Sequence, residues 1–468
     1  MPGKFFKRGP SATAGSPIRT TVTDMTEGVI WRHLVSFAFP LFVGNIFQQL
    51  YNTVDSVVVG NFVGADALGA VTSTISIVFT LIGLFIGMAM GASVVISQYF
   101  GAKDIVNLRR STHTAVVATV GLSIILSAVG YLSTPTLLRL MNTPESVMRE
   151  AVVYLQIYSL GLIGLMLYNM GSAILRAVGD SKRPLFFLIF SSILNIVLDL
   201  LFVIVFHAGV AGVAYATILS QLVSGLIIFW LLFRSHEPHS LTWREMRVDY
   251  GILKRVILLG LPTGLQLAVT GFSNVFVQGY INAYGAASTA GWGVYSRIDS
   301  FVILPIQSMA MAITTFVGQN AGARKPDRIR KGLRDCMAIS IGLTLAVVAV
   351  IYSIAPFMVS LFNRNEQVLY YGVLFLRLNS IFDPLNVTNQ IHAGALRGVG
   401  DAKTPMFIML GSFVLLRQIY LFIISRLTHS IYFIALGYPA GWLACSLLMM
   451  WHVRRSGWER KIELLAAR

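Results

Sequence analysis

The sequence is short of charged residues, cysteines and enzyme motifs. Only 12% of its 468 residues are charged, whereas soluble globular chains carry about 25%. Its two cysteines, Cys336 and Cys445, lie in apolar stretches and suggest neither a disulfide framework nor a metal cluster. His-Glu-x-x-His, Gly-x-Ser-x-Gly and Gly-x-x-x-x-Gly-Lys do not occur. We therefore expect neither an enzyme nor a bound cofactor.

Hydrophobic residues make up 55% of the chain. Long uncharged stretches recur, each able to form a helix of roughly 20 residues that crosses a bilayer and satisfies its own backbone hydrogen bonds. We expect an all-α polytopic membrane protein with twelve spans in the lipid bilayer. The predicted spans cover roughly 33–58, 66–95, 111–133, 147–173, 184–206, 209–233, 254–282, 290–316, 333–356, 367–392, 404–425 and 429–452.

The chain repeats itself at an offset of 221 residues. Leu-Arg-x-Val-Gly-Asp occurs at 175–180 and at 396–401, and Gln98 with its following Gly-Ala returns as Gln319. Six spans per half is an even number, so both halves start on the same side and the repeat is parallel. The Gly-Asp pairs favour turns between helices. The predicted regions are a cytoplasmic tail (1–30), a first six-helix lobe (31–233), a cytoplasmic linker (234–250), a second six-helix lobe (251–453) and a cytoplasmic tail (454–468).

The tail and the linker are polar. Residues 1–30 are basic and rich in Ser and Thr, without the apolar core of a signal peptide. In the linker, His236, Glu237 and His239 lack the spacing of a helical metal site. We expect the linker to be a solvated loop.

Asp55 is an acid inside the first predicted span. An acid at the centre of a span costs about 2.5–3.5 kcal/mol on insertion scales, so its presence needs a reason. Gln48, Asn52 and Asp55 are spaced i, i+4 and i+7 and share one helix face, and Tyr51 lies one turn before the acid. This face is a candidate wall of a polar cavity.

Asp199 is the second acid of the first half. Asn195 precedes it by one helical turn, and Thr217 lies in the next span. Together with Asp55, these side chains can form an oxygen-rich pocket that holds a hard cation or shares a proton. The sequence therefore predicts a cation site in the first lobe.

An alternative is that the two acids are structural polar groups between helices. The repeat argues against this, because the positions equivalent to Asn195 and Asp199 are Leu416 and Tyr420. Acids that only joined helices would be expected in both halves. The second half instead carries mixed charges, for which we expect structural ion pairs. These residues are Arg297, Asp299, Arg377, Asp383 and Arg417.

In these motifs the sequence resembles the MATE family of multidrug and toxic compound extrusion transporters, and its DinF-like branch in particular. The resemblance runs from about residue 28 to 452. It is carried by the stretch from Pro40 through Tyr-Asn-x-x-Asp55 to Gly64, by both Leu-Arg-x-x-Gly-Asp loops, by Asn-x-x-x-Asp199 and by the segment ending at Thr217.

The resemblance implies two six-helix bundles around a central cleft, which exchange H⁺ or Na⁺ for amphipathic, often cationic, drugs or toxic metabolites. It implies a monomer in a prokaryotic inner membrane. The implied cation-coupling residues, and the ligands of any Na⁺, are Asp55, Asn195, Asp199 and Thr217. The substrate-cavity candidates are Gln48, Tyr51, Asn52, Asn169 and Met170.

A NorM-type branch of the family has acids in spans 7 and 10 of the second lobe. Here span 7 has no acid between Arg255 and Arg297, and the matching position of span 10 is Asn386. Asp383 lies one turn earlier. We therefore expect cation coupling in the first lobe only.

Two other functions stay open from the sequence. A lipid-linked oligosaccharide flippase of the same superfamily would need extra spans or a strongly cationic cleft. An intramembrane enzyme would need Asp55 and Asp199 to act as a catalytic pair, whereas their Asn and Thr neighbours and the duplication favour transport.

The distribution of basic residues predicts the orientation of the chain. One side of the predicted membrane collects 29 of the 36 Lys and Arg residues, whereas the short loops 60–65, 207–211 and 283–289 have none. This asymmetry places both termini in the cytoplasm. It also accounts for the net charge of +16 without a nucleic-acid partner.

We predict that cysteines placed at residues 62 and 286 react with an impermeant thiol reagent added to intact cells, because both positions lie in loops without basic residues. Cysteines at residues 104 and 325 should react only after the membrane is opened. The reverse labelling pattern would contradict the orientation.

Overall fold

The structure is a computed structural model that describes residues 22–141 and 143–455; at 56 and in 65–81 only some side chains are described. The described chain is almost entirely helical. The first half contains seven α-helices and two π-helical segments, in the order α1 (Ile30–Val58), η1 (Val59–Val63), α2 (Ala65–Gly101), α3 (Ile105–Leu140), α4 (Glu145–Leu160), α5 (Leu162–Ala177), α6 (Lys182–Leu200), η2 (Leu201–Val205) and α7 (Gly209–Arg234).

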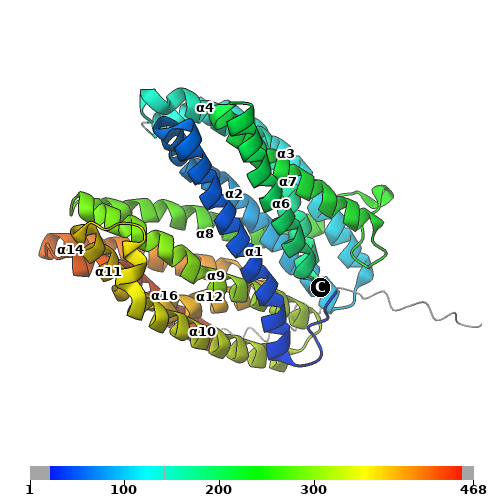
Figure 1. Ribbon diagram of the computed structural model, residues 1–468. Helices are drawn as coiled ribbons and strands as arrows, with labels where there is room; N and C mark the ends of the chain where they lie inside the picture. The colour runs from blue at the N-terminus through cyan, green and yellow to red at the C-terminus, as the bar shows by residue number, and fades with distance from the viewer. Residues whose placement is uncertain (1–21, 142, 456–468) are drawn as a thin grey trace, which may run out of the picture.

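The second half follows a short linker helix. Its elements form a second bundle whose axis is inclined to the first (Figure 1). The linker helix is η3 (Trp243–Glu245). The second bundle consists of α8 (Tyr250–Asn282), α9 (Ala286–Gly322), α10 (Pro326–Ser360), α11 (Glu366–Ser380), α12 (Asp383–Gly398), α13 (Lys403–Leu410), η4 (Gly411–Leu416), α14 (Arg417–Leu427), α15 (Ile431–Ala435) and α16 (Gly437–Arg455).

Helix boundaries follow the 221-residue repeat. α2, α4 and α6 begin at residues 65, 145 and 182, and their counterparts α9, α11 and α13 begin at 286, 366 and 403. Ten helical stretches of the described chain are long and apolar enough to span a membrane, and the number is eleven if the bent pair α4–α5 forms one span. The pair α11–α12 takes the equivalent place in the second lobe. The predicted all-α, two-lobe membrane fold is confirmed.

The repeated Gly-Asp sequences form turns, as predicted. Gly179 and Gly400 have φ angles of 86° and 91°, a left-handed conformation that glycine adopts without strain. In the first loop Asp180 accepts hydrogen bonds from the backbone N–H groups of Lys182 and Arg183, at the start of α6. Each turn therefore ends one helix and begins the next.

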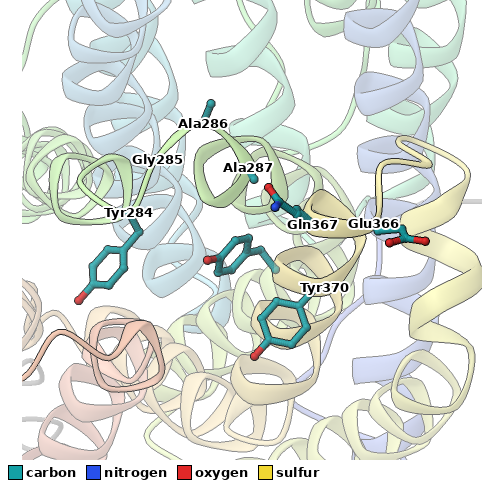
Figure 2. Close-up of a pocket in the computed structure, with 8 residues that line it drawn as sticks. Tyr284, Gly285, Ala286, Ala287, Glu366, Gln367 and Tyr370 are labelled. Carbon is teal, nitrogen blue, oxygen red and sulfur yellow. The ribbon is translucent and has the colours of Figure 1, made fainter.

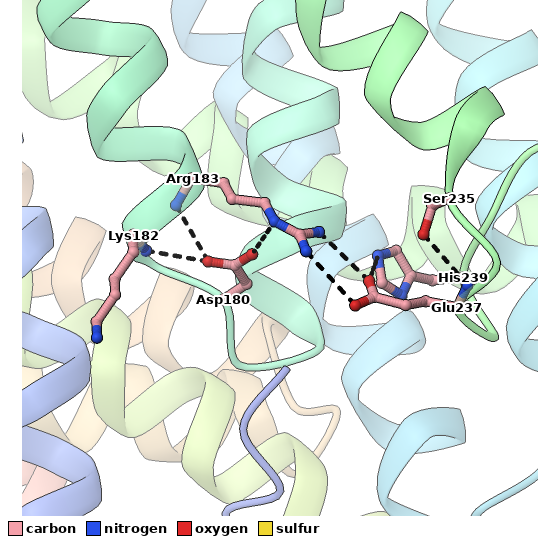
Figure 3. Close-up of polar contacts among 6 residues, drawn as sticks. All are labelled: Asp180, Lys182, Arg183, Ser235, Glu237 and His239. Atoms are coloured by element: carbon pink, nitrogen blue, oxygen red, sulfur yellow. Dashed lines mark hydrogen bonds and ion pairs between the residues drawn. The ribbon is translucent and has the colours of Figure 1, made fainter. Parts of the chain in front are cut away.

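Most of the linker is exposed or half-buried, as expected of a solvated loop, whereas His239, Ser240 and Leu241 at its centre are buried. Arg183 of the first lobe contacts both Asp180 and Glu237, and Glu237 also lies 3.3 Å from Nε2 of His239 (Figure 3). His239 is fully buried, and this burial lowers the pKa of its imidazole, which the nearby Glu237 carboxylate opposes. At neutral pH a neutral His239 therefore packs the linker against the first lobe.

The two lobes meet along α2 and α8. A Cβ added to Gly87 would collide with backbone atoms of Gly260 and Gly264. Close approach of this kind is the usual way that helices associate in lipid, where packing contacts replace the hydrophobic effect. The joint therefore depends on small residues on both helices.

Each lobe also receives the first turns of a helix from the other. Leu34, Phe37 and Leu41 of α1 pack in a core formed mainly by α9, α10 and α12. Ile252 and Val256 of α8 pack in the core of the first lobe. Because the exchange is reciprocal, α1 and α8 each connect the two bundles.

Candidate functional site

The predicted coupling residues come from three neighbouring helices of the first lobe. Asp55 is near the end of α1, Asn195 and Asp199 lie one turn apart on α6, and Thr217 is on α7. α6 packs against both α1 and α7. The carboxyl groups of Asp55 and Asp199 lie within interaction range of each other, so the structure brings the two acids of this half together.

Each of the four residues has a buried polar atom without a hydrogen-bond partner in the described part of the chain. These atoms are Oδ1 of Asp55, both amide atoms of Asn195, both carboxyl oxygens of Asp199 and Oγ1 of Thr217. Asp199 is fully buried, whereas Asp55 is half-buried. A buried polar group left unpaired costs about 1–3 kcal/mol, and a charged group costs more. The set is therefore suited to binding a proton or a small cation.

Tyrosines and an amide surround the acids. Tyr51 lies beside Gln48 and Gln221, and Tyr154 lies near both Asp55 and Asp199. The rings of Tyr154 and Tyr158 stack on α4 with their centroids 6.1 Å apart. Tyrosine hydroxyl groups and glutamine amides are therefore the further polar groups that lie close to the acids.

A small void adjoins this cluster. Its volume is about 10 Å³, and Thr217, Gln221 and Tyr158 are among the residues that line it. This is roughly the room that one water molecule needs. Of the four predicted coupling residues Thr217 alone lines the void, so this room for a water lies beside Thr217 and not between the acids.

A π-helical segment follows each acid. η1 begins four residues after Asp55, and η2 begins two residues after Asp199. Single π-helical turns are rare and frequently occur at functional sites, because the extra residue re-aims side chains and loosens the hydrogen-bond ladder. Hydrophobic periodicity alone does not reveal such segments, so they were not predicted from the sequence.

The substrate-cavity candidates have different surroundings. Gln48 is half-buried and Tyr51 is buried beside the acids, whereas Asn52 is exposed. Asn169 donates from Nδ2 to the Leu165 carbonyl of its own helix. Met170 is buried in the first-lobe core. Their role in binding a substrate stays a prediction.

The ion pairs expected in the second lobe are not formed within the described part of the chain. Arg297 is exposed, and Arg377 donates to the backbone carbonyl of Tyr352 while lying over its ring. Arg417 donates to Ser273 and Asn274. The expectation was wrong because Arg377 and Arg417 find neutral acceptors on neighbouring helices.

The acids of the second lobe instead face each other. Asp383 is buried with an unpaired Oδ2, and Asp299 lies within electrostatic range of it. Tyr295 lies beside both acids, and Arg417 stacks over Tyr438 at 4.7 Å. The second lobe therefore carries an acid pair with a buried positive charge nearby.

A separate hollow of about 480 Å³ lies at the opposite end of the second lobe from the linker. It is formed by the α8–α9 turn and the first turns of α11 (Figure 2). Tyr284, Tyr370 and Tyr371 line it, and tyrosines at span ends are typical of the membrane interface. None of the predicted coupling residues lines this hollow.

The two halves each match the same family profile. MatE matches residues 40–201 and residues 262–423, one match in each lobe. The chain belongs to the MATE family. MATE proteins are transporters, so this chain is a multi-pass membrane transporter and not an enzyme.

Relatives and solved structures agree with this membership. The chain is similar to the probable multidrug resistance protein YpnP of Bacillus subtilis, with 32% identity over 84% of this chain and 88% of that protein. YoeA of the same bacterium, also a probable multidrug resistance protein, is 29% identical over 92% and 95% of the two chains. A multidrug resistance MATE transporter of the MOP superfamily in an outward-facing conformation superposes with a TM-score of 0.87 at 25% identity, over 93% of this chain and 98% of that one. The DinF-like branch stays a prediction.

We predict that Asp383→Asn does not change the number of cations moved per exported molecule in liposomes. Asp383 leaves one carboxyl oxygen unpaired, whereas the first-lobe set has unpaired polar atoms on all four of its residues, Asp55, Asn195, Asp199 and Thr217. Asp199→Asn is the comparison variant. A changed ratio in Asp383→Asn would show that the second lobe also carries a cation.

Proposed function

We propose that this MATE protein is a cation-coupled antiporter that exports amphipathic, often cationic, small molecules. The observation that carries the proposal is the fully buried Asp199, whose carboxyl group has no hydrogen-bond donor in the described chain other than the neighbouring carboxyl group of Asp55. An unpaired carboxylate is expensive inside a membrane, so the pair gains most by binding H⁺ or Na⁺. The multidrug resistance proteins among its relatives support the substrate class.

The structure supports a mechanical link between this site and the lobes. The first turns of α1 pack in the second lobe, and Asp55 near its end faces α6 of the first lobe. Pro40 lies near the end of the part of α1 that packs in the second lobe, and it removes one backbone hydrogen bond from the helix. In the proposal, cation binding at Asp55 and Asp199 changes the bend of α1 and with it the relative position of the lobes.

Alternating access is then a consequence of linkage. The cation and the exported molecule must each bind one conformation better than the other, and each then lowers the affinity for the other by the same factor. The proposed location is a prokaryotic inner membrane, with the protein acting as a monomer and both termini in the cytoplasm.

We predict that Asp55→Asn and Asp199→Asn each abolish gradient-driven efflux of a fluorescent organic cation from vesicles. Both variants should still fold, because Asn keeps the size of the side chain. Asn195→Ala and Thr217→Ala should slow efflux by about tenfold, since each removes one neutral ligand of a charged group. Proton and Na⁺ gradients are imposed separately, which identifies the coupling ion.

Asp104→Asn is the matched control. Asp104 caps α3 by accepting a hydrogen bond from the Asn107 N–H outside the predicted spans, and Asn can make the same bond. This variant should transport like the wild type. Wild-type efflux in Asp55→Asn and Asp199→Asn would reduce both acids to structural groups and refute the proposal.

A further inference from the structure

Two buried glutamines at equivalent positions of the repeat reach across to the opposite lobe. Gln98, near the end of α2, donates through Nε2 to the Gly398 carbonyl at 3.0 Å. Gln319, near the end of α9, donates through Nε2 to the Ala177 carbonyl at 3.0 Å. Gly398 and Ala177 are the last residues of α12 and α5, directly before the repeated Gly-Asp turns. The repeat therefore relates the two bonds, and each joins one lobe to the other.

The amide oxygens of the same glutamines also accept bonds from the other half of the chain. Arg255 of α8 donates through Nη2 to Oε1 of Gln98 at 3.0 Å. The backbone N–H of Met25, in the segment before α1, donates to Oε1 of Gln319 at 2.9 Å. Ile252 and Val256, on either side of Arg255, pack in the same core as α2, and Met25 packs in the same core as α9. The Oε1 bonds therefore hold each glutamine in place, and the Nε2 bonds are the ones that would be lost if the lobes separated here.

Glycines make this close contact sterically feasible. A Cβ added to Gly101 would collide with the backbone carbonyl oxygen of Gln319, and a Cβ added to Gly322 would collide with that of Gln98. The ends of α2 and α9 therefore touch backbone to backbone. A side chain at either glycine would force the two helices apart.

The segment before α1 strengthens the contact from the first half. Lys325 donates to the Thr26 carbonyl at 2.9 Å, and Arg328 donates to the carbonyls of Met25, Glu27 and Gly28. All of these groups lie at the ends of α1, α2, α9 and α10 that the charge asymmetry assigns to the cytoplasm. The crossed bonds therefore close one side of the lobe interface.

We infer that Gln98 and Gln319 form the cytoplasmic gate of this transporter. Their crossed amide–carbonyl bonds hold the lobes together on the cytoplasmic side, and both must break before a compound can enter from the cytoplasm. The inference rests on the proposed export function, because it names the barrier that alternating access must open. Opening also separates the backbone contacts at Gly101 and Gly322.

The test measures how often the gate opens in the purified full-length protein, without substrate or ion gradient. Ser97 is fully buried beside Gly318 in this interface, so Ser97→Cys reports opening through its rate of reaction with a maleimide. Cys336 and Cys445 are replaced by Ala. When opening is rapid compared with labelling, the rate is proportional to the open population.

Gln98→Met and Gln319→Met keep the side-chain volume and remove the amide. Each should raise the labelling rate about fivefold, since each removes a hydrogen bond that exists only in the closed state. The double variant should raise it further. Gly101→Ala and Gly322→Ala should act in the same direction, and they keep the inference testable if the double variant does not fold.

Asn389→Leu is the matched control. Asn389 is a buried amide that donates to the Trp442 carbonyl within the second lobe, so its loss should lower stability without changing the labelling rate. Unchanged rates in both single glutamine variants, with stability lowered as in the control, would overturn the gate. A raised labelling rate in only one of the two single glutamine variants would contradict a gate made of two equivalent bonds. Failure of ion-driven efflux would refute the proposed function and leave this result unaffected.

Discussion

The cost of burying unpaired carboxyl groups in an apolar bundle is the constraint on which the rest of this structure depends. Asp199 has no hydrogen-bond donor in the described chain other than the neighbouring carboxyl group of Asp55. A structural acid would be expected to find donors, as Asp104 and Asp180 do at helix starts. In the proposed mechanism a bound cation completes the first-lobe pair, and its binding supplies free energy for conformational change.

α1 is the element that can transmit this free energy. Its first turns belong to the core of the second lobe, whereas its end, with Asp55 and η1, belongs to the first. The crossed glutamines hold the lobes at the opposite end of the same helix. In the proposed mechanism, cation binding and gate opening both change the relative position of the two lobes, so the free energy of cation binding can drive the opening of the gate.

Hydrophobic periodicity and the internal repeat were sufficient to predict the architecture from the sequence. The spans, the two lobes and the Gly-Asp turns appear where the 221-residue offset places them, and the spacing of Asn195 and Asp199 places both on one face. The surroundings of charged side chains could not be predicted, because they depend on tertiary contacts. Arg417 binds Ser273 and Asn274 of another helix, and His239 is buried by the first lobe. The π-helical segments after the acids likewise leave no periodic pattern.

Cation release on substrate binding tests the central claim most directly. An exported organic cation, identified in the vesicle assay, is added to purified protein in weakly buffered detergent solution, and released H⁺ or Na⁺ is measured. If Asp55 and Asp199 hold the coupling cation, the wild type releases cation on substrate addition and Asp199→Asn releases none. Equal release from Asp199→Asn that still binds the substrate would contradict the account.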